Sequence, residues 1–183
     1  YTYRRKLLDN LRHVFFFVIL MAIITSGAFL VLQYAPVGYI YLIPFAWCPV
    51  IARVFYDSRT AIFVHIITVF IVSIAVPAPY VFLFMQVLTG IVAVISLRDM
   101  TQRAQLAKTA AFILLAYSLL YTAVTVLTTG SITDLDYRLY FYFAINAVLV
   151  ICSYGLIFLF ERTFGLLSNI TLVELTNVNS NLM

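Results

Sequence analysis

Four long stretches of the chain contain no Asp, Glu, Lys or Arg: 13–52, 60–97, 109–133 and 139–160. A helix needs about 20 apolar residues to cross a hydrocarbon core of about 30 Å. The last two stretches therefore each fit one crossing, whereas each of the first two is about twice as long as one crossing requires. The pattern predicts two helical hairpins followed by two single crossings.

Each double-length stretch has a proline break near its middle, at Pro36 in the first and at Pro77 and Pro79 in the second. Proline removes a backbone donor and clashes with the preceding turn. Tyrosines flank both breaks, and such amphipathic rings favour the boundary between membrane and water. The sequence therefore predicts an all-α integral membrane bundle of six transmembrane helices, at about 14–33, 39–56, 60–76, 80–97, 109–128 and 138–160.

The overall composition supports a lipid environment for these helices. Hydrophobic residues make up 64% of the 183 positions and charged residues only 10%. A soluble domain carries about a quarter charged residues, because its surface must be hydrated. This chain has too few charges for such a surface.

The basic residues predict which ends of the helices face the cytoplasm. If alternate segments between helices share a side, ten of the eleven Lys and Arg residues fall on one side and only Arg138 on the other. Cytoplasmic segments carry the excess of Lys and Arg. We therefore expect both termini, the 57–59 turn and the 98–108 loop to be cytoplasmic. Because the positive charge is a topology signal, it does not favour nucleic-acid binding.

The chain offers no residues for catalysis. The interiors of the predicted helices lack charged side chains, which disfavours a proton-coupled pump or a cation channel. No catalytic triad, phosphate-binding loop or metal-ligand spacing is present, and Cys48 and Cys152 fall in apolar runs as packing residues. We therefore predict no catalytic site, no metal site and no cofactor in this chain.

Polar side chains inside the predicted helices are the first candidates for a binding site. Several of those between 117 and 125 share one face of the fifth helix. Such groups either hydrogen-bond neighbouring helices or line a ligand cavity open to the outside, and the sequence leaves both interpretations open. His65 also has two interpretations. It could hydrogen-bond a neighbouring helix, or it could act as a proton donor or bind an anion. The candidate cavity residues are His65, Gln86, Tyr117, Ser118, Tyr121, Thr122, Thr125, Asn146 and Ser153.

The second predicted helix contains Pro44 and Pro49 around Trp47. Two prolines in one short span bend or interrupt the helix. Interrupted spans form binding sites in some transporters, although many kinks only shape the packing. This kinked helix is therefore a second candidate site.

The segment that follows the last predicted helix carries the most specific signal. It reads E-R-T-F-G at 161–165 and T-L-V-E-L-T-N-V-N at 171–179. We divide the chain into a transmembrane domain, 1–163, and a connector, 164–183. The chain resembles the bacterial seven-transmembrane receptors with an intracellular HD hydrolase, in which an E-R-x-F-G motif ends the last helix and a T-L-x-E-L segment leads into the hydrolase.

The resemblance implies a location and a set of partners. The parent protein would lie in the bacterial cytoplasmic (inner) membrane, with an extracellular sensor domain and a cytoplasmic HD domain in the same polypeptide. The HD domain would hydrolyse cyclic di-AMP with a pair of divalent metal ions. This chain would be the membrane anchor and signal-transducing module. The residues expected to couple it to the hydrolase are Glu161, Arg162, Phe164, Gly165, Glu174, Asn177 and Asn179.

Other functions remain open for a six-helix chain of this size. One alternative is a small-molecule-binding membrane subunit, such as the substrate-binding component of a vitamin transporter. Another is a six-helix scaffold of the cell-wall machinery. The polar face of the fifth helix and the kinked second helix would suit the first of these. A small-molecule ligand and a second copy of the chain, forming a homodimer, are the open partners besides the lipid bilayer.

Overall fold

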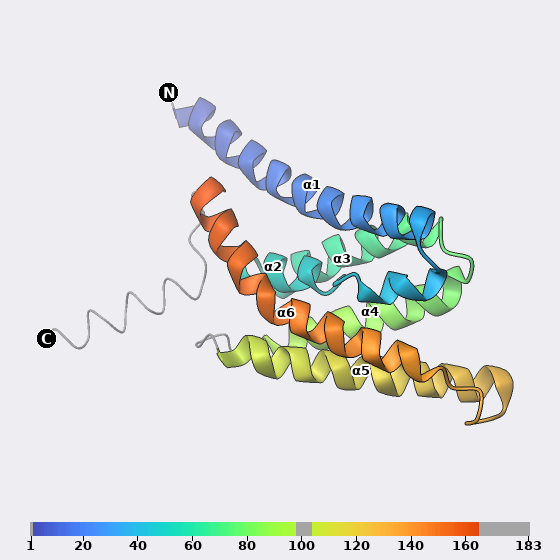
Figure 1. Ribbon diagram of the computed structural model, residues 1–183. Helices are drawn as coiled ribbons and strands as arrows, with labels where there is room; N and C mark the ends of the chain where they lie inside the picture. Colours follow the sequence, from blue (N-terminus) through green and yellow to red (C-terminus); the bar gives the residue numbers. More distant parts are fainter. Residues whose placement is uncertain (1, 98–103, 165–183) are drawn as a thin grey trace, which may run out of the picture.

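The computed structural model describes residues 2–97 and 104–164, which form helices joined by turns and contain no β-strand (Figure 1). The predicted all-α class is therefore confirmed. In chain order the elements are α1 (Thr2–Tyr34), the 3₁₀ helix η1 (Val37–Leu42), α2 (Trp47–Phe55), α3 (Ser58–Ser73), α4 (Pro79–Ser96), α5 (Ala104–Thr129) and α6 (Tyr137–Phe164).

Most of these helices, with η1 and α2 taken together, are long enough to cross a membrane, and we call each such crossing a pass. Among the described residues, five apolar helical segments have the length and composition of a membrane span: His13–Tyr34, Val37–Phe55, Pro79–Ser96, Gln105–Thr129 and Tyr137–Thr163. Helix α3 is also apolar, but its 16 residues rise only about 24 Å. The fold is thus compatible with a helical bundle in a membrane.

The second membrane pass, Val37–Phe55, differs from the prediction of one kinked helix over 39–56. The chain forms η1, leaves helical geometry at 43–46, and starts α2 at Trp47. Pro44 lies in the break, where its missing N–H costs no helical hydrogen bond. Pro49 lies in the first turn of α2, where the amide groups have no partner within the helix. The two prolines therefore interrupt the pass rather than bend it.

Local signals set several of the other helix ends. The Asp57 carboxylate accepts from the Arg59 amide at 3.2 Å, which caps the start of α3. Pro79 begins α4, where its fixed φ suits the first helical position. Gly130 follows α5 with φ of 71°, a left-handed conformation that glycine adopts without strain.

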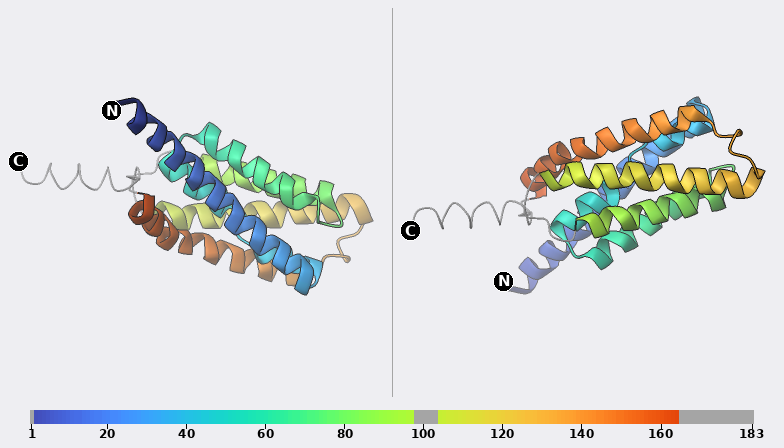
Figure 2. Two further views of the ribbon diagram at one scale, coloured as in Figure 1. Left: turned by 90° about the horizontal axis from the view of Figure 1, so that it is seen from above. Right: turned by 90° about the horizontal axis from the view of Figure 1, so that it is seen from below.

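Successive helices run antiparallel, so the start of α1 and the end of α6 lie at the same end of the bundle (Figure 1). Helix α1 crosses the other helices diagonally (Figure 2). At this shared end, the Phe16 ring packs edge-to-face on Phe55 of α2 and Phe160 of α6, with centroids 5.3 and 5.2 Å away. These contacts join the first, second and last passes.

The outer surface of the bundle is apolar. Large hydrophobic side chains such as Val18, Leu119 and Phe158 have at least half of their surface exposed. In water such a surface would drive aggregation, whereas in a bilayer it meets lipid tails. The helices therefore point their polar residues inward, which brings the candidate site residues together.

Candidate functional site

A hydrogen-bonded group connects three helices in the interior. The His65 Nε2–H of α3 donates to the Gln86 backbone carbonyl of α4 at 2.9 Å. The Tyr117 hydroxyl of α5 donates to Gln86 Oε1 at 2.5 Å. All three side chains are buried. Three of the candidate residues thus join α3, α4 and α5 around Gln86.

Gly90 makes this arrangement sterically feasible. A Cβ atom added at Gly90 would lie 2.1 Å from His65 Nε2, so the imidazole rests directly on the α4 backbone. Only a residue without a side chain permits such an approach. The spacing of Gln86 and Gly90, one helical turn apart, therefore fixes where His65 docks.

Several buried polar atoms near this group have no protein partner. Because His65 Nε2 carries the proton in its bond to a carbonyl, Nδ1 is a bare acceptor, and no described group donates to it. Gln86 Nε2 and Thr89 Oγ1 are likewise unpartnered within the described part of the chain. Unpaired polar atoms are costly in a low-dielectric interior. A water molecule or a polar ligand atom would satisfy them only where the interior leaves room for it.

The predicted polar face of α5 divides into two parts. Tyr117 joins the group around Gln86, whereas the other members lie nearer the end of α5. Thr122 Oγ1 lies 2.5 Å from the Tyr140 hydroxyl of α6, and the Tyr121 hydroxyl accepts from the Asp136 amide at 3.0 Å. Ser118 is half-buried and Thr125 is buried on the same helix. The second part therefore connects α5 to α6 and its preceding loop.

Asn146 and Trp47 attach the interrupted second pass to α6. Asn146 Nδ2 donates to the carbonyl oxygens of Tyr41 and Ile43, both at 2.9 Å. In the opposite direction, Trp47 Nε1 donates to the Leu149 carbonyl at 2.7 Å. The break frees backbone carbonyls, and α6 supplies a donor for two of them. Of the two interpretations that the sequence left open for Asn146, these bonds are of the kind that joins neighbouring helices.

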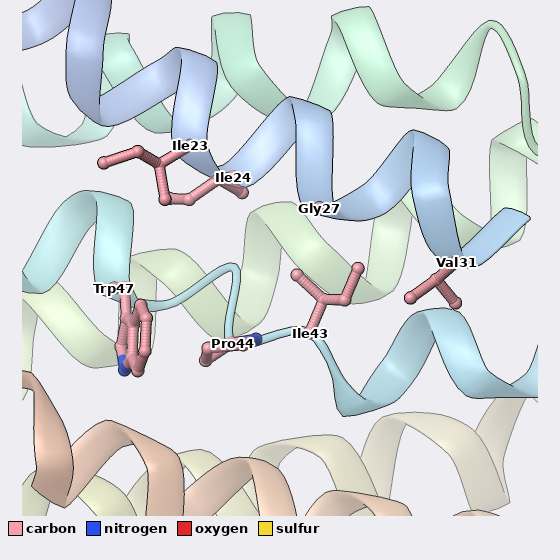
Figure 3. Close-up of a pocket in the computed structure, with 7 residues that line it drawn as sticks. All are labelled: Ile23, Ile24, Gly27, Val31, Ile43, Pro44 and Trp47. Atoms are coloured by element: carbon pink, nitrogen blue, oxygen red, sulfur yellow. The ribbon is translucent and has the colours of Figure 1, made fainter.

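A pocket of about 240 Å³ lies beside this break, between α1 and the second pass (Figure 3). Side chains from α1 face the segment that contains Pro44, and Trp47 closes one end. Pro49 is buried two residues after Trp47, in the first turn of α2. Sequence reasoning found Pro44 and Trp47 but missed the contribution of α1. The residues lining the pocket are Ile23, Ile24, Gly27, Val31, Ile43, Pro44 and Trp47.

The remaining predicted residues are spread more widely. Ser153 is buried on α6, and no described group bonds to its Oγ. Glu161 is half-buried and Arg162 exposed in the last turns of α6, which ends at Phe164. The other coupling residues, Gly165, Glu174, Asn177 and Asn179, lie outside the described residues.

The fold and its interior define a class of protein. Within the described ranges, no three His, Cys, Asp or Glu side chains are placed to hold a metal ion. The buried groups that remain are hydroxyls, amides and one imidazole, which suit helix association and ligand contact. The arrangement is that of a multi-pass helical membrane domain.

Comparison with known proteins identifies the family of this domain. The family described as "7TM receptor with intracellular HD hydrolase" matches residues 1–168, and the chain belongs to it. This match confirms the resemblance predicted from the segment after the last helix. No curated protein and no solved structure matches the chain.

Proposed function

We propose that this chain is the sensing and coupling module of a membrane-bound cyclic di-AMP phosphodiesterase. The observation that carries the proposal is the family match over residues 1–168, because that family joins a membrane receptor to an intracellular HD hydrolase. The E-R-T-F-G sequence at 161–165 supports it, because it coincides with the end of α6. Hydrolysis then belongs to an HD domain in the same polypeptide, and this chain regulates it.

The metal pair of an HD hydrolase is part of the proposal but not of this chain. The described residues provide no set of three ligands for such an ion. By the resemblance, both divalent ions belong to the HD domain. By the same resemblance, an extracellular sensor domain and one further helix precede the six passes described above.

The charge distribution supports the orientation of the module. Of the nine basic residues within the described ranges, eight lie in or near the helix ends at the side of the bundle where α1 begins, and Arg138 lies at the other side. Positive residues accumulate on the cytoplasmic side. We therefore place the start of α1 and the end of α6 in the cytoplasm of a bacterium, where the HD domain would act.

Helix α6 is the element that would transmit a signal. It extends to Phe164, and inside the bundle it bonds to the second pass through Asn146 and Leu149. A change in the packing of the second pass would move these contacts. Regulation requires that a ligand or domain favour one of two such arrangements.

The test uses the full-length protein and replaces Phe164-Gly165 with Gly-Ser. The measured quantity is the ratio of cyclic di-AMP hydrolysis in nanodiscs to hydrolysis in detergent. We expect a ratio that differs from one in the unmodified protein and moves to one in the variant, with hydrolysis in detergent unchanged. A matched control places Gly-Ser at Ile132-Thr133, two exposed residues in the loop between α5 and α6.

Two results would contradict the proposal. If the full-length protein does not hydrolyse cyclic di-AMP, the substrate is wrong. If the ratio is one in the unmodified protein, or is the same after replacement of Phe164-Gly165, the coupling through α6 is wrong.

A further inference from the structure

The pocket between α1 and the second pass has the character of a site for a hydrocarbon chain. Ile23, Gly27 and Val31 recur every four residues, so they line one side of α1 facing the break. Gly27 has no atom within 4 Å of the position that its Cβ would take, which leaves the centre of this side open. From residue 23 to residue 31 the pocket extends about 12 Å along the helix.

The chemistry of the lining selects the occupant. All seven lining residues are apolar except for the indole N–H of Trp47, which is already bonded to Leu149. Water does not enter apolar cavities of this kind, because it finds no partners there. A linear hydrocarbon chain fits both the shape and the polarity.

We propose that this pocket binds the acyl chain of a membrane lipid, and that its occupancy regulates α6. Val31 lies one turn before the end of α1 at Tyr34. In the orientation given above, the lipid would therefore come from the outer leaflet, with its headgroup beyond Tyr34. The regulatory part rests on the proposed function, whereas the binding part does not.

The contacts of the lining residues provide the connection to α6. Ile43 lines the pocket with its side chain, and its carbonyl accepts from Asn146. Trp47 lines the pocket with its ring and donates to Leu149. Any occupant that shifts Ile43 or Trp47 therefore acts on hydrogen bonds that fix the second pass to α6.

Binding is tested with the full-length protein in nanodiscs that contain a phospholipid with a diazirine in its acyl chain. After irradiation and digestion, mass spectrometry quantifies labelling of the peptides that contain residues 23–31 and 41–47. Gly27→Phe fills the pocket from α1, and we expect it to reduce this labelling at least fivefold. Gly155→Phe is the matched control, because Gly155 is an exposed glycine on α6 that also has no atom within 4 Å of its Cβ position.

A second arm identifies any competing occupant. A photoactivatable leucine replaces Ile23, and its adducts are analysed by mass. Lipid adducts support the proposal. Adducts with a protein segment outside 1–183, or with a second copy of the chain, overturn it, as does unchanged labelling in Gly27→Phe. If Gly27→Phe does not fold, as judged by its thermal midpoint, Gly27→Leu takes its place.

The regulatory part is tested by hydrolysis in nanodiscs of long-chain and short-chain phospholipids. We expect the rate of hydrolysis to differ at least fivefold between the two lipids, both for the unmodified protein and for Gly155→Phe. We expect Gly27→Phe to have the same rate in both lipids. Loss of labelling in Gly27→Phe without loss of the lipid response would overturn the regulatory part. Absence of hydrolysis in every protein would instead contradict the proposed function, and the labelling would still decide the binding site.

Discussion

At the scale of single residues, the buried polar side chains determine how the helices align more than how stable they are. Hydrogen bonds between membrane helices average only about 0.6 kcal/mol. The Gln86 side chain nevertheless receives the Tyr117 hydroxyl while its own carbonyl receives His65. A register shift of α4 by one residue would break both bonds. These groups therefore specify one arrangement of α3, α4 and α5.

The contact between His65 and Gly90 gives the sharpest prediction at this scale. Gly90→Ala places a methyl group on the imidazole, so His65 must move and lose its bond to Gln86. We expect the free energy of unfolding to fall by about 1–3 kcal/mol, as for other overpacked sites. Thermal unfolding in detergent measures it.

Two further variants make the Gly90 prediction specific. Gly155→Ala is the control, since its methyl group enters open space and should leave the thermal midpoint unchanged or raise it slightly. His65→Ala should remove most of the effect of Gly90→Ala in a double-mutant cycle. If Gly90→Ala and Gly155→Ala destabilise the protein equally, the loss of stability comes from the helix backbone and not from the contact with the imidazole.

At the scale of helices, the sequence predicted the passes but not the interior of the second one. Pro36 and Pro77 follow the ends of α1 and α3, and Pro79 begins α4, because each lies where the chain turns, which is a local property. For Pro44 and Pro49 the sequence left open whether they bend the helix or interrupt it. They interrupt it because Asn146, about 100 residues later, satisfies the carbonyls that the interruption frees. No local pattern contains such a distant partner.

The role of Asn146 leads to a prediction for the second pass. Asn146→Leu removes the donor to Tyr41 and Ile43 and leaves both carbonyls buried without it. We expect a loss of about 1–2 kcal/mol in the free energy of unfolding. Hydrogen exchange of the peptides spanning 37–46 should accelerate. Gln33→Leu, an amide-to-leucine change at an exposed position of α1, should alter neither.

The cap of α3 gives a prediction with a pH dependence. Thr60 and the Arg59 amide donate to the Asp57 carboxylate, which lowers its pKa below the ordinary value of 3.8. The cap therefore contributes fully above pH 3.8, and its contribution is lost as the pH falls through the folded-state pKa. We expect Asp57→Ala to cost about 1 kcal/mol at pH 7.

A pH series of thermal unfolding checks the prediction for Asp57. The difference between the unmodified protein and Asp57→Ala should shrink below pH 3.8. Asp57→Asn retains a capping oxygen without the charge, so it should cost less at neutral pH. Its difference from the unmodified protein should shrink by the same amount below pH 3.8, because only the unmodified protein has a carboxyl group that titrates there. A difference that stays constant down to low pH would contradict a role for the carboxylate charge.

At the scale of the whole molecule, the lengths of the apolar runs predicted more than the polar residues did. The number of passes follows from the lengths of apolar runs, and these are sums over many residues. The site depends instead on rotation of each helix about its axis. The polar face of α5 therefore looked continuous, whereas Tyr117 contacts α4 and Thr122 contacts α6. Whether these groups hold a ligand stays a prediction.

The membrane orientation is the prediction on which the coupling to an intracellular hydrolase depends. Lys108 and Asp134 are both exposed, on α5 and in the loop after it, at opposite ends of the bundle. We replace each with cysteine in a Cys152→Ala background and treat intact bacteria with a membrane-impermeant maleimide. Asp134→Cys should react in intact cells, and Lys108→Cys only after permeabilisation, because ten of the eleven Lys and Arg residues are expected on the cytoplasmic side. The opposite result would put the end of α6 outside the cell. In that orientation α6 could not act on a hydrolase in the cytoplasm, even if its contacts with the second pass do transmit a change in packing.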